Sequence, residues 1–167
     1  MTATRWSGLA VALLAGASAG TAQEAPSLSK SGSTSVTGYY QFRLLEAVEM
    51  GDLGVHNAHA LDGMIRNAKG EPYFDGMTAH CVVHHQQLPD DFGIRYSCAW
   101  LDLDGDSVYF VGEDHTGKGG LPSRTGGTGK YENAAFEIPK LEVRPVFGPT
   151  QQLEGLMIDY DIAWQPK

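Results

Sequence analysis

Cys98-Ala-Trp-Leu-Asp-Leu-Asp-Gly-Asp-Ser-Val-Tyr-Phe-Val111 is the stretch that decides the fold class. It consists of two apolar runs with the dipeptide Asp104-Gly105 between them. Asp-Gly is typical of a two-residue hairpin turn, because that turn needs positive φ angles, which Asp tolerates and Gly adopts freely. The stretch therefore predicts a β-hairpin with arms at residues 94–103 and 106–113.

The first and last segments of the predicted domain show a period of two, which is typical of half-buried strands. In residues 36–49, one face carries Val36, Tyr40, Phe42 and Leu44. In residues 156–164, apolar side chains occupy every second position, at Leu156, Ile158, Tyr160, Ile162 and Trp164. Both segments are predicted to be strands with one apolar face.

The middle of the chain alternates strands with Gly- and Pro-containing connections. Residues 78–88 predict a strand, and residues 136–147 predict a short strand pair interrupted by Pro139 and Pro145. Residues 51–76 read as loop with one short strand, and residues 117–129 as a flexible connection. About eight strands without a helical stripe predict an all-β fold. We expect one antiparallel eight-stranded closed barrel, in preference to a sandwich, over residues 36–167.

The N-terminus has the features of a secretory signal peptide. Arg5 is followed by the apolar run 9–14 and by small residues, with cleavage after Ala19 or Ala22 fitting equally well. We therefore expect a signal peptide at residues 1–22, a flexible lead-in at 23–35, and a secreted or periplasmic protein. A short membrane anchor fits less well, because a polar tract follows. No later apolar run is long enough for a membrane helix, so no membrane insertion is expected after signal removal.

Charge and cysteine content restrict the partners and the redox state. The formal net charge is −8, and an acidic protein lacks the basic patch that nucleic acid requires. The chain has two cysteines, Cys81 and Cys98, and in an oxidising compartment such a pair is expected to form a disulfide. A reactive or metal-binding thiol pair fits less well, because the C-x-x-C spacing is missing.

Asp102, Asp104, Asp106 and Glu113 resemble the ligand spacing of a calcium-binding EF-hand loop. Ser107 stands where that loop needs glycine, and no helices flank the segment. A hairpin turn with solvated carboxylates is the preferred interpretation, and calcium binding by these residues stays open.

The histidines offer a second candidate metal site. His80, His84 and His85 have the spacing of a helical zinc site, and His56, His59 and His115 are further candidates. On a strand, residues four apart are separated by about 13 Å, so His80 and His84 could not bind one metal ion. We expect neither a metal nor a nucleotide cofactor, and the histidines stay open as ligands.

Gly126-Gly-Thr-Gly-Lys-Tyr-Glu-Asn-Ala134 is the most distinctive string. It resembles the G-G-T-G-[KR]-[FY]-x-x-A signature of the allene oxide cyclase and dirigent-like eight-stranded barrels. With Cys98 and residues 102–106, the chain is also similar to small exported bacterial proteins of unassigned function in that superfamily. Phe136 departs from the dirigent pattern, which has Gly there. The resemblance implies a barrel fold and assigns no catalytic residue.

The expected function is binding of a small apolar molecule in the barrel lumen. The expected ligand-binding residues are Tyr40, Phe42, Tyr160 and Trp164, with the tyrosine hydroxyls orienting the ligand. The alternative is an isomerase, cyclase or lyase acting on a small hydrophobic substrate, as the resemblance implies for some members. A third interpretation is an envelope protein that acts through its surface. The ligand, the catalytic residues and the oligomeric state, including a homo-oligomer, stay open.

Overall fold

The computed structural model describes residues 28, 30–71, 73–116 and 120–167. The predicted signal peptide lies outside this part, as do residues 23–27 and 29 of the predicted lead-in. The strands are β1 Gly32–Glu49, β2 Val55–Asn67, β3 Met77–Gln87, β4 Phe92–Leu101, β5 Ser107–Asp114, β6 Pro122–Gly127, β7 Ala134–Phe147 and β8 Leu153–Pro166. Two short 3₁₀ helices, η1 Gly51–Leu53 and η2 Gly129–Tyr131, lie in connections. None of the helices in the described residues is long or apolar enough to span a bilayer.

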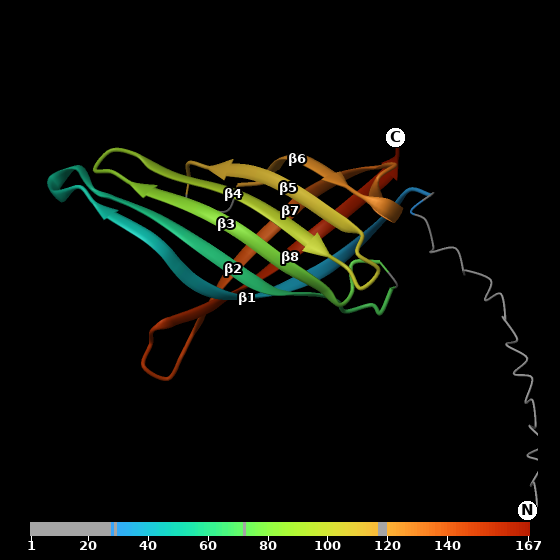
Figure 1. The fold of residues 1–167 in the computed structure, drawn as a ribbon, viewed down its shortest axis with the longest axis horizontal. Helices are drawn as coiled ribbons and strands as arrows, with labels where there is room; N and C mark the ends of the chain where they lie inside the picture. Colours follow the sequence, from blue (N-terminus) through green and yellow to red (C-terminus); the bar gives the residue numbers. More distant parts are fainter. Residues whose placement is uncertain (1–27, 29, 72, 117–119) are drawn as a thin grey trace, which may run out of the picture.

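All eight strands belong to one antiparallel sheet with the order β6-β5-β4-β3-β2-β1-β8-β7. Figure 1 shows the sheet curling so that β6 and β7, at the two ends of this order, come side by side. Thr125 Oγ1 on β6 donates a hydrogen bond of 2.6 Å to the carbonyl oxygen of Phe136 on β7. No strand pairing joins β6 to β7 among the described residues. The barrel predicted from the sequence is confirmed, in a nearly closed form.

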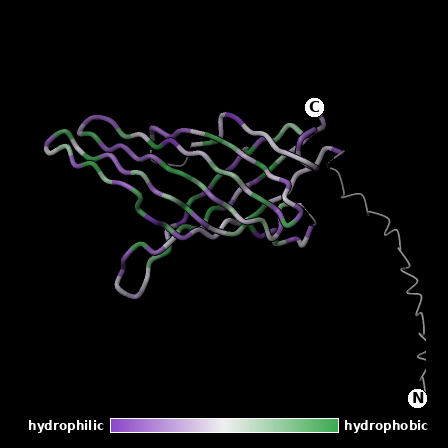
Figure 2. The backbone as a smooth tube through the Cα atoms, viewed as in Figure 1, coloured by the Kyte–Doolittle hydropathy of each residue, from purple (hydrophilic) through white to green (hydrophobic). Residues whose placement is uncertain are grey.

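Alternation along the strands gives the barrel an apolar interior. On β5, Val108, Phe110 and Asp114 are buried, and Tyr109, Val111 and Glu113 are exposed. Figure 2 shows the same alternation of hydrophobic and hydrophilic positions along the backbone of several strands. The period-two faces predicted for residues 36–49 and 156–164 belong to β1 and β8, which pair over Gly32–Gln41 and Gly155–Trp164. β1 begins at Gly32 rather than at Val36.

The predicted hairpin of residues 98–111 is formed by β4 and β5, with Cys98 opposite Phe110. Its turn differs from the prediction. β4 ends at Leu101 and β5 begins at Ser107, so residues 102–106 connect them. Of these five residues, only Gly105 has a positive φ, 88°. The connection is a five-residue loop, because the Asp102 carboxylate accepts hydrogen bonds from the backbone N–H groups of Asp104 and Asp106 at 2.9 and 3.0 Å.

Lys130, on η2, joins this turn to the Gly126–Ala134 string. Its Nζ lies 2.6 Å from Asp102 Oδ2 and 2.9 Å from Asp104 Oδ2, and its backbone N–H donates to Asp106 Oδ2 at 3.0 Å. The side chains of Lys130 and Asp102 are each 8% exposed. Burial raises the pKa of Asp102, but the bonds from Lys130 and the turn backbone outweigh it and lower that pKa overall. Asp102 is therefore a buried partner of Lys130, and the prediction that its carboxylate is solvated was wrong.

Residues 51–76 were predicted as loop with one short strand, whereas the structure has a long strand there, β2. Its 13 residues pair with both β1 and β3. The inward positions include His59, Gly63 and Asn67, so the apolar period is hidden. Gly63 lies opposite Tyr40, and a Cβ atom there would meet the backbone oxygen of Tyr39 at 2.1 Å. Glycine is therefore required where β1 and β2 approach closely.

The region after β5 also differs from its prediction. Residues 122–127, expected to lie in a flexible connection, form β6 and pair with β5. Residues 134–147 form the single strand β7 rather than a strand pair, with an irregularity in its register between Glu137 and Lys140, beside Pro139. A proline cannot donate to a strand ladder, which explains a bulge at this point.

The predicted disulfide is confirmed. Cys81 on β3 and Cys98 on β4 lie directly opposite each other in the antiparallel register and are bonded. Their separation of 17 residues corresponds to roughly 3 kcal/mol of stabilisation if the bond acts by restricting the unfolded chain.

Candidate functional site

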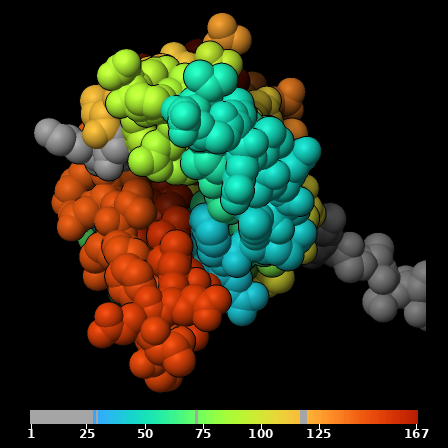
Figure 3. All heavy atoms as spheres, turned by 90° about the vertical axis from the view of Figure 1, so that its left-hand side faces the viewer, coloured from blue at the N-terminus to red at the C-terminus, as the bar shows by residue number. Residues whose placement is uncertain are grey.

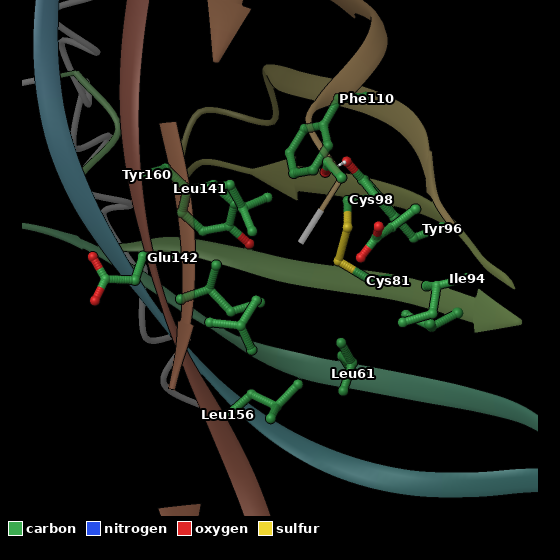
Figure 4. Close-up of a pocket in the computed structure, with 15 residues that line it drawn as sticks. Leu61, Cys81, Ile94, Tyr96, Cys98, Phe110, Leu141, Glu142, Leu156 and Tyr160 are labelled. Atoms are coloured by element: carbon green, nitrogen blue, oxygen red, sulfur yellow. Dashed lines mark hydrogen bonds between the residues drawn. A yellow bond between two sulfur atoms is a disulfide. The ribbon is translucent and has the colours of Figure 1, made fainter. Parts of the chain in front are cut away.

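The interior of the barrel contains a cavity of about 540 Å³. Figure 4 shows side chains from several strands converging on it. Apolar side chains and the disulfide form most of its wall. The lining residues are Leu61, Cys81, Val83, Ile94, Tyr96, Cys98, Phe110, Asp114, Gly120, Leu141, Glu142, Val143, Leu156, Ile158 and Tyr160. The volume lies within the range of about 300–1,000 Å³ that is usual for small-molecule sites.

Strand register explains why these side chains meet. Cys81 and Val83 follow one another on the inward face of β3, and Cys98 and Tyr96 lie opposite them on β4. Because side chains alternate across a strand, residues two apart share one face. The disulfide is therefore part of the cavity wall, as Figure 4 shows.

Aromatic side chains fill the barrel on one side of the cavity. Trp100 is fully buried, with its ring centroid 4.9 Å from Tyr160 and 5.1 Å from Phe110, and both contacts are edge-to-face. Farther along, Phe74 packs on Tyr131 at 5.4 Å and edge-on against Phe136. This packing forms a solid floor, so the cavity occupies only part of the barrel.

The opposite end of the barrel is open in shape. β1 pairs with β8 only as far as Gln41, and beyond this point the β1–β2 and β7–β8 hairpins diverge (Figure 1). Figure 3 views this end and shows a hollow between the two hairpins. The hairpins expose large apolar side chains, including Leu44, Val48, Phe147 and Leu153. An apolar molecule would meet several exposed apolar side chains at this end.

Asp114 is the most buried carboxylate in the wall of the cavity. It is 4% exposed, and its Oδ1 accepts bonds from the backbone N–H and the hydroxyl of Thr116, both at 2.7 Å. Tyr96 donates its hydroxyl proton to the carbonyl oxygen of Gly120 at 2.6 Å. Burial, with the charge of Asp114, raises the pKa of Tyr96 to about 12. The cavity thus contains an acidic group and a protonated phenol near one another.

Glu142 also lines the cavity, but it is placed differently. It is exposed, and its carboxylate lies 3.5 Å from Lys140 Nζ. In Figure 4 this carboxylate points away from the other lining side chains. Its contribution to the wall does not place its charge in the lumen.

His59 lies on the inward face toward the open end. Its ring stacks on Phe42 at 4.2 Å, and its buried Nδ1 has no hydrogen-bond partner among the described residues. Burial, assisted by the nearby His85, lowers the pKa of His59 below the ordinary 6.5. His59 is therefore a neutral imidazole at neutral pH.

The four residues predicted to bind ligand occupy different parts of the barrel. Tyr160 lines the cavity. Tyr40 does not line it, but its hydroxyl oxygen lies 2.9 Å from that of Tyr160, and the two form a hydrogen bond. Phe42 packs on His59 nearer the open end. Trp164 lies among the floor aromatics against Phe74, and its indole N–H donates to the carbonyl oxygen of Lys30 at 2.8 Å. The structure thus brings Tyr40 and Tyr160 together and places Phe42 and Trp164 elsewhere.

Sequence reasoning missed Asp114 and Tyr96. Asp114 could have been found from the sequence, because it lies at every second position after Val108, Phe110 and Gly112, on the side of β5 that faces the interior. A carboxylate at a position that faces the core is unusual unless it has partners or a function. Tyr96 could have been found from its position two residues before Cys98.

The candidate metal ligands are not brought together. Within residues 28, 30–71, 73–116 and 120–167, no group of three or more His, Cys, Asp or Glu side chains is arranged to hold a metal ion. Asp102 and Asp104 pair with Lys130, and Glu113 lies 3.6 Å from Arg95. His80 Nδ1 contacts an Asp62 oxygen at 2.5 Å, and His84 is 5.9 Å, centroid to centroid, from His56.

Comparisons of the chain with family models, with curated proteins and with solved structures give no match.

Proposed function

We propose that this chain is an exported binding protein that holds a small apolar molecule in the barrel lumen. The observation that carries the proposal is the cavity of about 540 Å³ with its largely apolar wall. Burying a ligand against such a wall is favoured by roughly 25 cal/mol per Å² of apolar surface removed from water. The eight-stranded barrel is the fold that the resemblance to allene oxide cyclase and dirigent-like proteins implies, and it supports membership of that superfamily as part of the proposal.

Two neighbouring valines allow a matched test of lumen binding. Val83 lines the cavity, whereas Val82 is on the opposite face of the same strand and lines a shallow outer depression. The probe is N-phenyl-1-naphthylamine, a neutral apolar dye that fluoresces in apolar surroundings. Val83→Trp should raise the dissociation constant of the dye at least about tenfold, equivalent to about 1.4 kcal/mol. Val82→Trp should leave it within twofold. Equal effects of the two substitutions would contradict binding in the lumen.

Export is tested separately, by mass spectrometry of the intact protein from its own host. A mature chain that begins after Ala19 or Ala22 would support a secreted or periplasmic location. A chain that retains Arg5 would contradict it.

A second candidate function is an isomerase, cyclase or lyase, and Asp114 is the observation that favours it. A buried carboxylate in an apolar cavity is suited to moving a proton to or from a bound substrate. Asp114→Asn keeps an oxygen for the bonds from Thr116 and removes the acidic group. Molecules extracted from wild type and variant, produced in the same host, should differ if Asp114 is catalytic. The same extracted compound in both would favour binding alone.

A further inference from the structure

Three buried polar side chains meet beneath the cavity. Tyr40, Tyr160 and Trp100 are 4%, 2% and 0% exposed. The two hydroxyl oxygens are 2.9 Å apart, and either can be the donor. The indole Nε1 of Trp100 has no hydrogen-bond partner among the described residues. Buried polar groups are normally satisfied, so this cluster needs an explanation.

The cluster has more protons than internal acceptors use. Each phenol carries one proton, and a single hydrogen bond between the two hydroxyls uses only one of them. Trp100 cannot accept the other, because an indole N–H is a donor only. One hydroxyl proton is therefore directed away from the pair.

Access to the cavity distinguishes the two hydroxyls. The hydrogen bond between them can run in either direction. If Tyr160 donates, the spare proton is on Tyr40, which does not line the cavity and whose neighbour Trp100 is itself a donor. If Tyr40 donates, the spare proton is on Tyr160, at the cavity wall. An acceptor in the cavity therefore favours the arrangement in which Tyr40 donates to Tyr160.

Of these three side chains, only Tyr160 lines the cavity. In Figure 4, Tyr160 reaches from β8 into the space between the lining side chains. Burial holds the pKa of Tyr160 well above its ordinary value of 10.0, so the proton is present at neutral pH. The other lining phenol, Tyr96, already donates its proton to Gly120.

We infer that the molecule bound in the lumen carries a hydrogen-bond-accepting oxygen, such as a carbonyl or ether oxygen, that receives the proton of Tyr160. This inference rests on the proposed binding function and adds the chemical class of the ligand. The apolar wall holds the body of the molecule, and Tyr160 fixes the position of its oxygen. A hydrocarbon would leave the Tyr160 donor buried without an acceptor, which costs binding free energy.

The test uses two probes of nearly the same shape, benzophenone and diphenylmethane, which differ by a carbonyl in place of a methylene group. Their dissociation constants are measured by displacement of N-phenyl-1-naphthylamine. The quantity measured is the ratio of the diphenylmethane constant to the benzophenone constant. Comparing this ratio between wild type and variant cancels the different solubilities of the two probes in water. In Tyr160→Phe this ratio should fall about threefold to tenfold below that of wild type, as expected for loss of one hydrogen bond.

Two further variants separate this role from a structural one. Tyr96→Phe alters a phenol in the same cavity whose proton is already used, so the ratio should be that of wild type. Tyr40→Phe breaks the same phenol pair but keeps the Tyr160 proton, so the ratio should again persist.

An unchanged ratio in Tyr160→Phe, with both probes still bound, would overturn the inference and leave the binding function standing. A fall of equal size in Tyr40→Phe would also overturn it, since disruption of the pair would then explain the effect. If wild type binds neither probe nor the dye, the proposed function itself fails.

Discussion

Replacing Lys130 with methionine should destabilise the protein strongly, because it breaks a buried ion pair. The substitution keeps an unbranched side chain of similar length and removes the charge that faces Asp102 and Asp104. Removing one partner of a buried ion pair costs roughly 3–5 kcal/mol, because the other charge stays buried without compensation. The lower end, about 3 kcal/mol, is expected here, since both side chains keep 8% exposure. The corresponding fall in melting temperature is about 10 °C.

Urea denaturation followed by tryptophan fluorescence gives the free energy of unfolding, and Lys140→Met is the matched control. Lys140 pairs with Glu142 at 3.5 Å, but these side chains are 59% and 56% exposed, so the same substitution should cost less than about 0.5 kcal/mol. Adding Asp102→Asn to Lys130→Met should recover part of the loss, because the uncompensated charge is gone. If Lys130→Met costs no more than Lys140→Met, the account of the buried pair is refuted.

Acid should reduce the difference between wild type and Lys130→Met. Asp102 has a pKa below its ordinary 3.8 in the folded protein, so it binds fewer protons there than in the unfolded chain. The stabilisation is therefore fully present above the ordinary pKa and is lost as the pH falls through the lowered one. The two unfolding free energies should converge below pH 3.8.

Three further outcomes are expected. Gly63→Ala should destabilise by about 3 kcal/mol, because its Cβ would meet backbone at 2.1 Å, whereas Gly93→Ala, with its nearest neighbour at 3.8 Å, should be nearly neutral in the same urea assay. Cys81→Ala combined with Cys98→Ala should lower the unfolding free energy by roughly 3 kcal/mol, and a loss below about 1 kcal/mol would contradict the chain-entropy account. His59 should titrate below pH 6.5 by NMR, since burial disfavours its charged form, and a value at or above 6.5 would contradict its placement.

Much of the fold could be predicted from local pattern because the strands that carry the pattern are half-buried. β8 is the clearest case: its inward residues are apolar, and the outward Asp159 and Asp161 accept hydrogen bonds from Thr37 and Ser35 on β1. In such strands the period of two directly reports which side faces the core.

β2 and β6 could not be predicted because some of their inward positions are occupied by polar residues or glycine instead of apolar residues. Asn67 is buried, yet its amide donates to the Thr34 hydroxyl at 3.0 Å, so a polar residue occupies a core position at little cost. On β6, a Cβ atom at Gly126 or Gly127 would overlap the side chain of Tyr109 or Tyr131. Glycine there is a packing requirement, although in sequence it indicates a loop.

The cavity could be predicted only in outline. An eight-stranded barrel of this size either fills with side chains or holds one ligand, and the sequence pattern is the same in both cases. The outcome depends on side-chain volumes from strands distant in sequence, such as Leu61, Phe110 and Ile158. The period of two on β8 was enough to predict that Tyr160 faces inward. Its place in the same cavity wall as Tyr96 and Asp114 depends on strands distant in sequence, so it required the three-dimensional structure.

The unpaired edge of β7 bears on how the protein avoids aggregation. From Lys140 onward, β7 pairs only with β8 among the described residues, which leaves one side of its backbone without a strand partner. Such an edge invites a strand from another molecule. This edge, however, contains Pro139 and Pro145, and between them Lys140, Glu142 and Arg144 project from the strand. Prolines and charges on an edge oppose strand addition, so two copies of this chain are not expected to associate by extending the sheet across β7, and a homo-oligomer would have to use a different surface.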